Sequence, residues 1–211
     1  MKKSLLTLIA IVGLSVPLSA HQLWLEREGS VMNAYFGHWP NFKEKEEGER
    51  LKAIKGVEVT PKEAYLKTVR QSDHVEVFVN KIGDIGLTEA LEPRKGKMVD
   101  FTVRTIFLAR EGRSESKTLL ELDMVPEASH SNTFTLMLNN KPLPKTKVVL
   151  TAPNTWSKNF MSDEAGKVTL QTPWLGDYVA QLDYTDKTKG EVNGKTYEQT
   201  NYVMTLHFSV K

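Results

Sequence analysis

The sequence predicts a mostly β protein in which two β-sandwich domains follow a cleaved signal peptide. Three observations support this fold class. Apolar and polar residues alternate in many short runs, which is the period of a strand with one buried face. Turn-forming residues separate these runs at regular intervals. Beyond a polar segment near residue 130 lies a unit of about 80 residues with short strands, a length that suits a small β-sandwich.

Residues 1–20 have the three parts of a secretory signal peptide. Lys2 and Lys3 give a positive start, residues 5–18 form an apolar stretch, and residues 19–20 give a small-residue cleavage site. An uncleaved membrane anchor is the alternative, but the stretch is shorter than the roughly 20 apolar residues that span a bilayer. We therefore expect a mature chain that begins at His21, lies in the periplasm of a Gram-negative bacterium and does not span the membrane.

The charge balance and the lack of cysteine exclude several classes of function. The chain has 28 Lys and Arg residues against 26 Asp and Glu residues, and two of the lysines belong to the signal peptide. The mature chain therefore carries 26 residues of each sign, and no basic field remains that would indicate nucleic-acid binding. With no cysteine in the sequence, disulfides and thiolate metal sites are excluded. A metal ion would need His, carboxylate, Met or N-terminal amine ligands.

The N-terminal β domain is predicted over residues 21–128, and its first element is a hairpin. Residues 22–38 alternate on both sides of a Gly-Ser turn, which predicts two antiparallel strands. The run 43–50 is so rich in charge that we interpret it as an exposed loop or short helix rather than a site. Residues 60–69 begin with a capping-box pattern, which is compatible with a short helix, but the segment could equally be a strand. Further strands are expected at 74–80, 99–110 and 118–125.

The C-terminal β-sandwich domain is predicted over residues 129–211, because Pro, Ala, Ser, His and Asn cluster at 126–132 as they do in linkers. Residues 139–142 form a turn signal between two strands. Asp163 and Gly166 belong to another turn, in which Asp bonds its own backbone and Gly supplies a positive φ. Asp163 is therefore interpreted as structural rather than catalytic. Strands are expected at 133–138, 147–151, 168–172, 177–184 and 202–210.

Several segments, taken in order along the chain, resemble one protein family. They are HQLWLE at 21–26, AYFGH at 34–38, LLELDMVP at 119–126, NKPLP at 140–144, SDEAG at 162–166, GDYV at 176–179 and the strand 202–210. Together they resemble the DUF4198 family, which is related to periplasmic nickel-uptake components. The resemblance implies a periplasmic β protein linked to nickel or cobalt uptake, with an inner-membrane metal transporter as its partner. It also implies a second domain similar to carboxypeptidase regulatory-like and transthyretin-like sandwiches, which are Ig-like in architecture.

His21 is the most informative residue for chemistry. Cleavage after Ala20 would leave an α-amine and an imidazole on the same residue. The amine titrates near pH ~7.7–8 and the imidazole near ~6.5, so both can be neutral at modest cost around pH 7. Together they can chelate one metal ion through the amine nitrogen and Nδ1, and a second histidine would complete a three-nitrogen site. Such a site suits Cu(II) but can also hold Ni(II), so the ligand types do not select the metal.

His38 is the first candidate for that second histidine, because the hairpin carries it back toward the start of the mature chain. His207 is the next candidate, and its place on the polar face of the last strand predicts that it faces solvent. His74 and His130 are expected to be exposed. The predicted metal ligands are therefore His21, His38 and His207, and the predicted cofactor is a transition-metal ion: nickel, cobalt or copper.

These observations predict a non-enzymatic accessory protein for the uptake or handling of a transition metal. One alternative is a metal-independent β-sandwich that binds a protein or a glycan through an exposed Trp156 or Trp174. Another is a mono-copper redox enzyme, although the short spacing between His21 and His38 does not resemble such enzymes. The sequence contains no Gly-x-Ser-x-Gly, His-Glu-x-x-His or phosphate-binding glycine loop. Trp24, Tyr35 and Trp39 are expected either to shield a metal site or to belong to the core and its rim.

Overall fold

The structure, a computed structural model, describes residues 21–47, 49–96 and 99–211. The predicted signal peptide lies outside the described residues. Within them the protein is a mostly β sandwich of several packed sheets, as the alternating pattern predicted. The two short helical elements are α1 (Glu49–Lys52) and the 3₁₀ turn η1 (Lys62–Ala64). No helix in the described ranges is both long and apolar enough to cross a membrane.

An eight-stranded sheet forms the middle of the molecule, in the order β14-β13-β16-β19-β9-β7-β4, with β8 paired to β9. Its two longest strands on the C-terminal side, β16 and β19, pair antiparallel along their whole length. β19 then pairs with β9 in parallel, so that Gln199 lies opposite Val103. The strands are β4 (Glu58–Thr60), β7 (Ile85–Ala90), β8 (Arg94–Lys95), β9 (Thr102–Glu111), β13 (Lys147–Thr151), β14 (Ser157–Met161), β16 (Gly176–Asp186) and β19 (Gln199–Val210).

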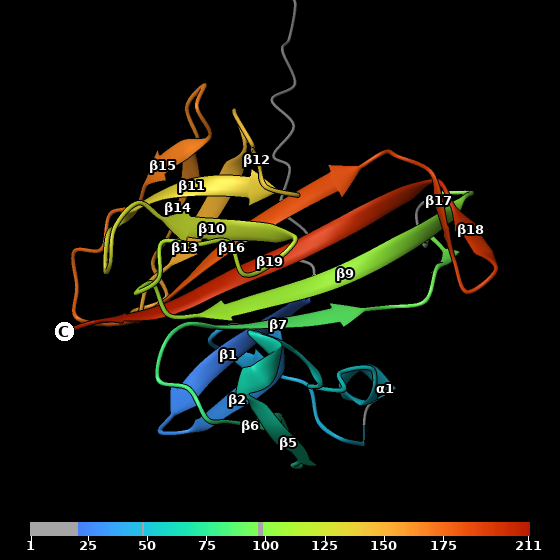
Figure 1. The fold of residues 1–211 in the computed structure, drawn as a ribbon, viewed down its shortest axis with the longest axis horizontal. Coiled ribbons are helices and arrows are strands. Elements are labelled where there is room, and N and C mark those ends of the chain that lie inside the picture. Colours follow the sequence, from blue (N-terminus) through green and yellow to red (C-terminus); the bar gives the residue numbers. More distant parts are fainter. Residues whose placement is uncertain (1–20, 48, 97–98) are drawn as a thin grey trace, which may run out of the picture.

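Two further sheets cover the central sheet. The five-stranded sheet has the order β1-β2-β6-β5 with β3 paired to β2, and the four-stranded sheet has the order β10-β11-β12 with β15 beside β11. In Figure 1 the blue and teal strands of the first sheet lie below β7 and β9, and the yellow β10 and β11 lie above β19. The first sheet contains β1 (Gln22–Glu28), β2 (Val31–His38), β3 (Phe42–Lys43), β5 (Tyr65–Arg70) and β6 (Val75–Val79). The second contains β10 (Leu122–Pro126), β11 (Thr133–Leu138), β12 (Lys141–Pro142) and β15 (Lys167–Thr169), and a separate hairpin pairs β17 (Gly190–Val192) with β18 (Lys195–Tyr197).

Both faces of the central sheet are therefore buried, and each carries its own apolar core. Because side chains alternate along a strand, β9 places Leu108 in one core and Phe107 in the other. β19 does the same with Met204 and Val203. The core on one side is built mainly from residues beyond 118, and the core on the other mainly from residues before 110. The central sheet takes strands from both sides of the predicted domain boundary at residues 128–129. The division of the chain into two domains therefore stays a prediction.

Several local predictions can be compared with these elements. The hairpin over residues 22–38 is confirmed, with Gln22 opposite Gly37 and a turn at Gly29. The Asp163 turn is also confirmed, because Asp163 Oδ1 accepts hydrogen bonds of 2.8 Å from the backbone nitrogens of Ala165 and Lys167. Over residues 60–69, of the two equal alternatives, the strand is confirmed for most of the segment and the short α-helix does not form. Only a single 3₁₀ turn forms, and the chain then continues as β5 because its backbone pairs with β6.

Candidate functional site

The β1–β2 hairpin brings His21 and His38 together. His21 directly precedes β1 and His38 is the last residue of β2, so the antiparallel register places them at the same end of the hairpin. The centroids of their imidazole rings lie 4.6 Å apart, with an angle of 58° between the ring planes. The spatial proximity expected from the sequence is thus present. Both side chains are partly exposed, so the pair is accessible from solvent.

A glycine shapes the chain at this point. Gly37 has φ +151°, and an added Cβ would overlap the carbonyl oxygen of Phe42. This close approach arises because the chain turns back immediately after His38 and pairs as β3 with the end of β2. Glycine is the residue that tolerates both the backbone conformation and the approach. The tight return also places Phe42 and Glu44 beside the two histidines.

Glu44 and Arg50 contact the His21 ring at Nε2. Glu44 Oε1 lies 2.5 Å from that nitrogen, Arg50 Nη1 lies 2.7 Å from it, and the two charged groups are 3.0 Å apart. One ring nitrogen cannot donate to Glu44 and accept from Arg50 at the same time. The short contact with a carboxylate favours Nε2–H as the donor, because charge-assisted hydrogen bonds are the stronger ones. Nδ1 of His21 is then left with its lone pair in the neutral ring.

The electrostatic environment keeps Glu44 ionised and His38 neutral. Burial alone would raise the pKa of Glu44, but the hydrogen bonds from His21 and Arg50 outweigh this effect and lower it. Burial lowers the pKa of His38, and the proximity of the titratable His21 ring lowers it further. His38 Nδ1 is buried and has no hydrogen-bond partner among the described residues. A neutral imidazole with an unsatisfied ring nitrogen is the form in which histidine binds metal ions.

His207 does not join this pair, and its predicted exposure to solvent is wrong. Its residue is only 5% exposed, because the five-stranded sheet covers the face of β19 that the sequence pattern marks as polar. Nδ1 lies 2.5 Å from Glu111 Oε2, on the neighbouring position of β9. Burial favours the neutral ring, but the hydrogen bond and the negative charge of Glu111 outweigh it and raise the pKa of His207. We conclude that His207 serves a buried ion pair between strands.

The remaining histidines lie elsewhere. His74 is half-buried rather than exposed: its Nδ1 lies 2.6 Å from Asp73 Oδ1, and its ring centroid lies 5.0 Å from that of Tyr35. His130 is exposed, as predicted, in the segment before β11. Among the residues that the structure describes, no three His, Asp or Glu side chains form a group that could hold a metal ion. A site at His21 and His38 would therefore need a ligand that is not a side chain.

Two of the aromatic residues expected near the site lie away from it. Trp24 and Tyr35 stack on each other with ring centroids 5.5 Å apart, on the opposite face from His21 and His38. They therefore belong to the core and its rim and do not shield the histidines. Phe36 and Phe42 are the aromatic neighbours of His21, at centroid distances of 5.3 and 6.2 Å.

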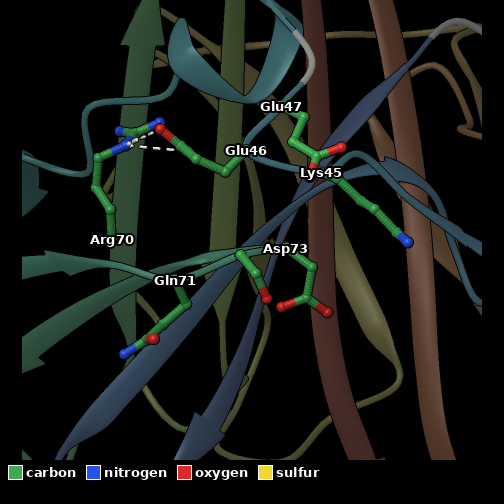
Figure 2. Close-up of a pocket in the computed structure, with 7 residues that line it drawn as sticks. Lys45, Glu46, Glu47, Arg70, Gln71 and Asp73 are labelled. Carbon is green, nitrogen blue, oxygen red and sulfur yellow. Dashed lines mark hydrogen bonds and ion pairs between the residues drawn. The ribbon is translucent and has the colours of Figure 1, made fainter.

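The charged run 43–50 contains the residues that the sequence interpretation missed. It was interpreted as solvated and without a role, yet Glu44 and Arg50 form the hydrogen-bonded surroundings of His21. The rest of the run fits that interpretation. Lys45, Glu46 and Glu47 line an open groove of about 700 Å³ together with residues 70–73. Figure 2 shows the ion pair between two of the residues that line this groove, in which Arg70 contacts Glu46 at 3.2 Å.

A separate cavity of about 480 Å³ lies beside His21. Its wall includes Arg50 from α1 and Phe36 from β2, and its far side is formed by residues of the central sheet such as Phe107 and Val203. The histidine pair thus lies at the edge of a hollow that reaches to the central sheet.

Two tryptophans named as candidates for ligand binding are neighbours in the structure. Trp156 and Trp174 make an edge-to-face contact with ring centroids 5.3 Å apart. Trp174 is 40% exposed, and the adjacent Leu175 is 72% exposed. The pair lies in loops of the C-terminal half, and neither tryptophan lines the cavity beside His21.

Comparisons with known proteins give little further information. No protein-family model matches the sequence, and no curated protein matches it significantly. Membership of the DUF4198 family stays a prediction. Among solved structures, the chain is similar to the Bacteroides ovatus mixed-linkage glucan utilization locus protein SGBP-B in complex with a mixed-linkage heptasaccharide. The identity is 9%, the TM-score is 0.19, and the similarity covers 87% of this chain and 45% of that chain. A similarity of this size supports no conclusion about function.

Proposed function

We propose that the mature protein is a non-enzymatic periplasmic accessory protein that binds one nickel, cobalt or copper ion through His21 and His38. The observation that carries this proposal is the juxtaposition of the two imidazoles at 4.6 Å at the start of β1. The α-amine that cleavage after Ala20 would expose is the third nitrogen ligand. Delivery of the ion to or from an inner-membrane transporter is the role that we assign to this binding.

The surroundings of His21 fit such a site chemically. The chelate requires a lone pair on Nδ1, since that atom lies nearer the α-nitrogen than Nε2 does. The hydrogen bond to Glu44 places the proton on Nε2, and it also fixes the ring orientation. The unsatisfied Nδ1 of His38 supports a role for this ring as the other imidazole donor. Arg50 holds the Glu44 carboxylate at 3.0 Å and balances its charge.

Metal titration of the exported protein tests the proposal. The N-terminus is first confirmed as His21 by mass spectrometry, and Ni(II), Co(II) and Cu(II) are then titrated by calorimetry. We expect one ion per chain, and His38→Ala should weaken its binding at least tenfold. Insertion of one alanine between Ala20 and His21 keeps the imidazole but removes the chelate, so it should weaken binding at least as much. His130→Ala, which alters an exposed histidine far along the chain, is the matched control. Equal affinity in all four proteins would refute the site.

A second function is favoured by the Trp156–Trp174 pair. Exposed aromatic rings give large contact areas to sugar rings and to apolar protein side chains, and Trp174 is 40% exposed with Leu175 beside it. This alternative, a metal-independent β-sandwich that binds a glycan or a protein, predicts that Trp174→Ala abolishes retention on a glycan array or a partner column. It also predicts that EDTA has no effect on that retention.

A further inference from the structure

The cavity beside His21 combines an apolar interior with a charged rim. Its volume of about 480 Å³ lies in the range of small-molecule sites. Phe36, Ile54, Leu91, Phe107 and Val203 supply apolar side chains to its wall. Phe36 and Phe107 meet edge to face with centroids 4.9 Å apart, so a ring or short alkyl chain entering the cavity would meet aromatic carbon. Water that leaves such a surface favours binding of an apolar group.

The charges at the rim favour an anion. Glu49 pairs with Lys52 at 3.1 Å, and Arg50 pairs with Glu44, so these charges are largely compensated. Arg94, from β8, lines the same cavity and has no carboxylate within 4.0 Å among the described residues. A guanidinium presents a planar fork of donors that matches a carboxylate in two parallel hydrogen bonds. The rim therefore has one surplus positive charge that a bound carboxylate would neutralise.

Two neutral polar groups lie in the same wall. Thr105 on β9 and Asn201 on β19 are direct neighbours in the parallel register and both line the cavity. Asn201 Oδ1 already accepts hydrogen bonds from Thr185 and Gln199, at 3.1 and 2.9 Å. The Asn201 amide therefore has its NH₂ group available as a donor, and the Thr105 hydroxyl adds another. The wall therefore offers hydrogen-bond donors, and the rim offers a guanidinium group. Together they favour a ligand that has an apolar body and a head group rich in hydrogen-bond acceptors.

We propose that this cavity binds a small amphipathic carboxylate, with the carboxylate at Arg94 and the apolar body against Phe36 and Phe107. The site goes beyond the proposed metal-binding function and does not require a metal ion. It gives the protein a second ligand site, and His21 lies in its wall.

The experiment uses the exported protein in EDTA, so that its result is independent of metal binding. Three probes with the same phenyl ring and four-carbon chain but different end groups are titrated by calorimetry. They are 4-phenylbutyrate, the uncharged 4-phenyl-1-butanol and the cationic 4-phenylbutylamine. We expect 4-phenylbutyrate to bind about tenfold more tightly than the alcohol and the amine to bind weakest. Arg94→Gln should lower the affinity for 4-phenylbutyrate about tenfold and leave that for the alcohol unchanged. Lys95→Gln, next on β8 and paired with Asp100, is the matched control and should change neither affinity.

A cavity-filling variant completes the test. Thr105→Trp should block the alcohol and the carboxylate alike, and circular dichroism will show whether that variant is folded. If Thr105→Trp is unfolded, the comparison of Arg94→Gln with Lys95→Gln decides the outcome. Equal binding of all three probes, no binding of 4-phenylbutyrate, or an unchanged affinity in Arg94→Gln would overturn the proposal.

Discussion

At the scale of single residues, the strongest constraint in the molecule is a buried arginine. Arg110 is fully buried, and its guanidinium lies 2.7 Å from Asp84 and 2.9 Å from Asp123. The same group donates to the backbone oxygens of Glu115 and Lys117. A charge in this environment is tolerated because nearly all of its hydrogen-bonding groups are satisfied. The cluster ties β9 to the segment that leads into β10.

Replacement of Arg110 therefore has a large expected cost. Arg110→Met should lower the free energy of unfolding by about 3–5 kcal/mol, because it leaves two buried carboxyl groups without their partner. Urea denaturation followed by tryptophan fluorescence measures this change. Lys117→Gln breaks the neighbouring but exposed pair with Glu115 and should cost less than about 1 kcal/mol. A similar loss in both variants would contradict this account.

At the scale of elements, the sequence predicts hairpins better than it predicts which faces are covered. The strands over residues 22–38 follow from alternation and a glycine turn, and both signals are local. At 60–69 the sequence leaves a short helix and a strand equally open, because only the pairing with β6 decides for the strand. The error at His207 has another cause: alternation identifies a polar face, but only the packing of a second sheet shows that this face is buried. The sequence does not identify Glu44 and Arg50 as neighbours of His21. A solvated run of charged residues and a charged site contain the same residue types, so composition alone does not distinguish them.

Gly37 gives a test at the scale of the hairpin. Gly37→Ala should destabilise the protein by about 3 kcal/mol, since it adds steric overlap with Phe42 to the strain of a positive φ. Gly29→Ala is the matched control in the same hairpin, because its φ is also positive, at +60°, but an added Cβ has nothing within 4 Å. That variant should cost only about 1 kcal/mol. Thermal unfolding of the two variants measures the difference in stability. An equal loss of stability in both would show that the chain around Phe42 moves to remove the overlap.

At the scale of the whole molecule, pH should alter the stability of the fold through an ion pair between two strands of the central sheet. His207 on β19 pairs with Glu111 on β9, and Asp177 on β16 and Glu26 on β1 also raise its pKa. Arg27 on β1 is the cationic group near Glu111. The folded-state pKa of His207 is above the unfolded value of about 6.5. The ion pair therefore stabilises the fold fully below that pH and loses its effect as the pH rises through the folded-state value.

Glu89 contributes in the same direction. Burial raises its pKa to about 7, despite hydrogen bonds from the backbone nitrogens of Gly56 and Lys55. We expect the free energy of unfolding to fall as the pH rises from about 4.5 through about 7, because Glu89 loses its proton there. It should keep falling above about 6.5 as His207 loses its proton, and this second part should be absent in His207→Gln, which cannot titrate. Chemical denaturation at several pH values measures both slopes. His130→Gln, at an exposed position, should keep the wild-type slope, and an unchanged slope in His207→Gln would show that this ring does not titrate in the range.

The parallel pairing of β9 with β19 has a consequence for how the chain acquires its fold. The middle of the central sheet joins residues 103–111 to residues 199–207, so its register depends on contacts that are far apart in the sequence. Closing a loop of that length costs entropy before any of the contacts can offset it, and proteins rich in such contacts fold slowly. A nascent or translocating chain that has not yet released β19 lacks the strand that contributes side chains to both cores. The central layer can therefore be completed only after β19 has emerged, and until then β9 and β16 each lack one neighbouring strand.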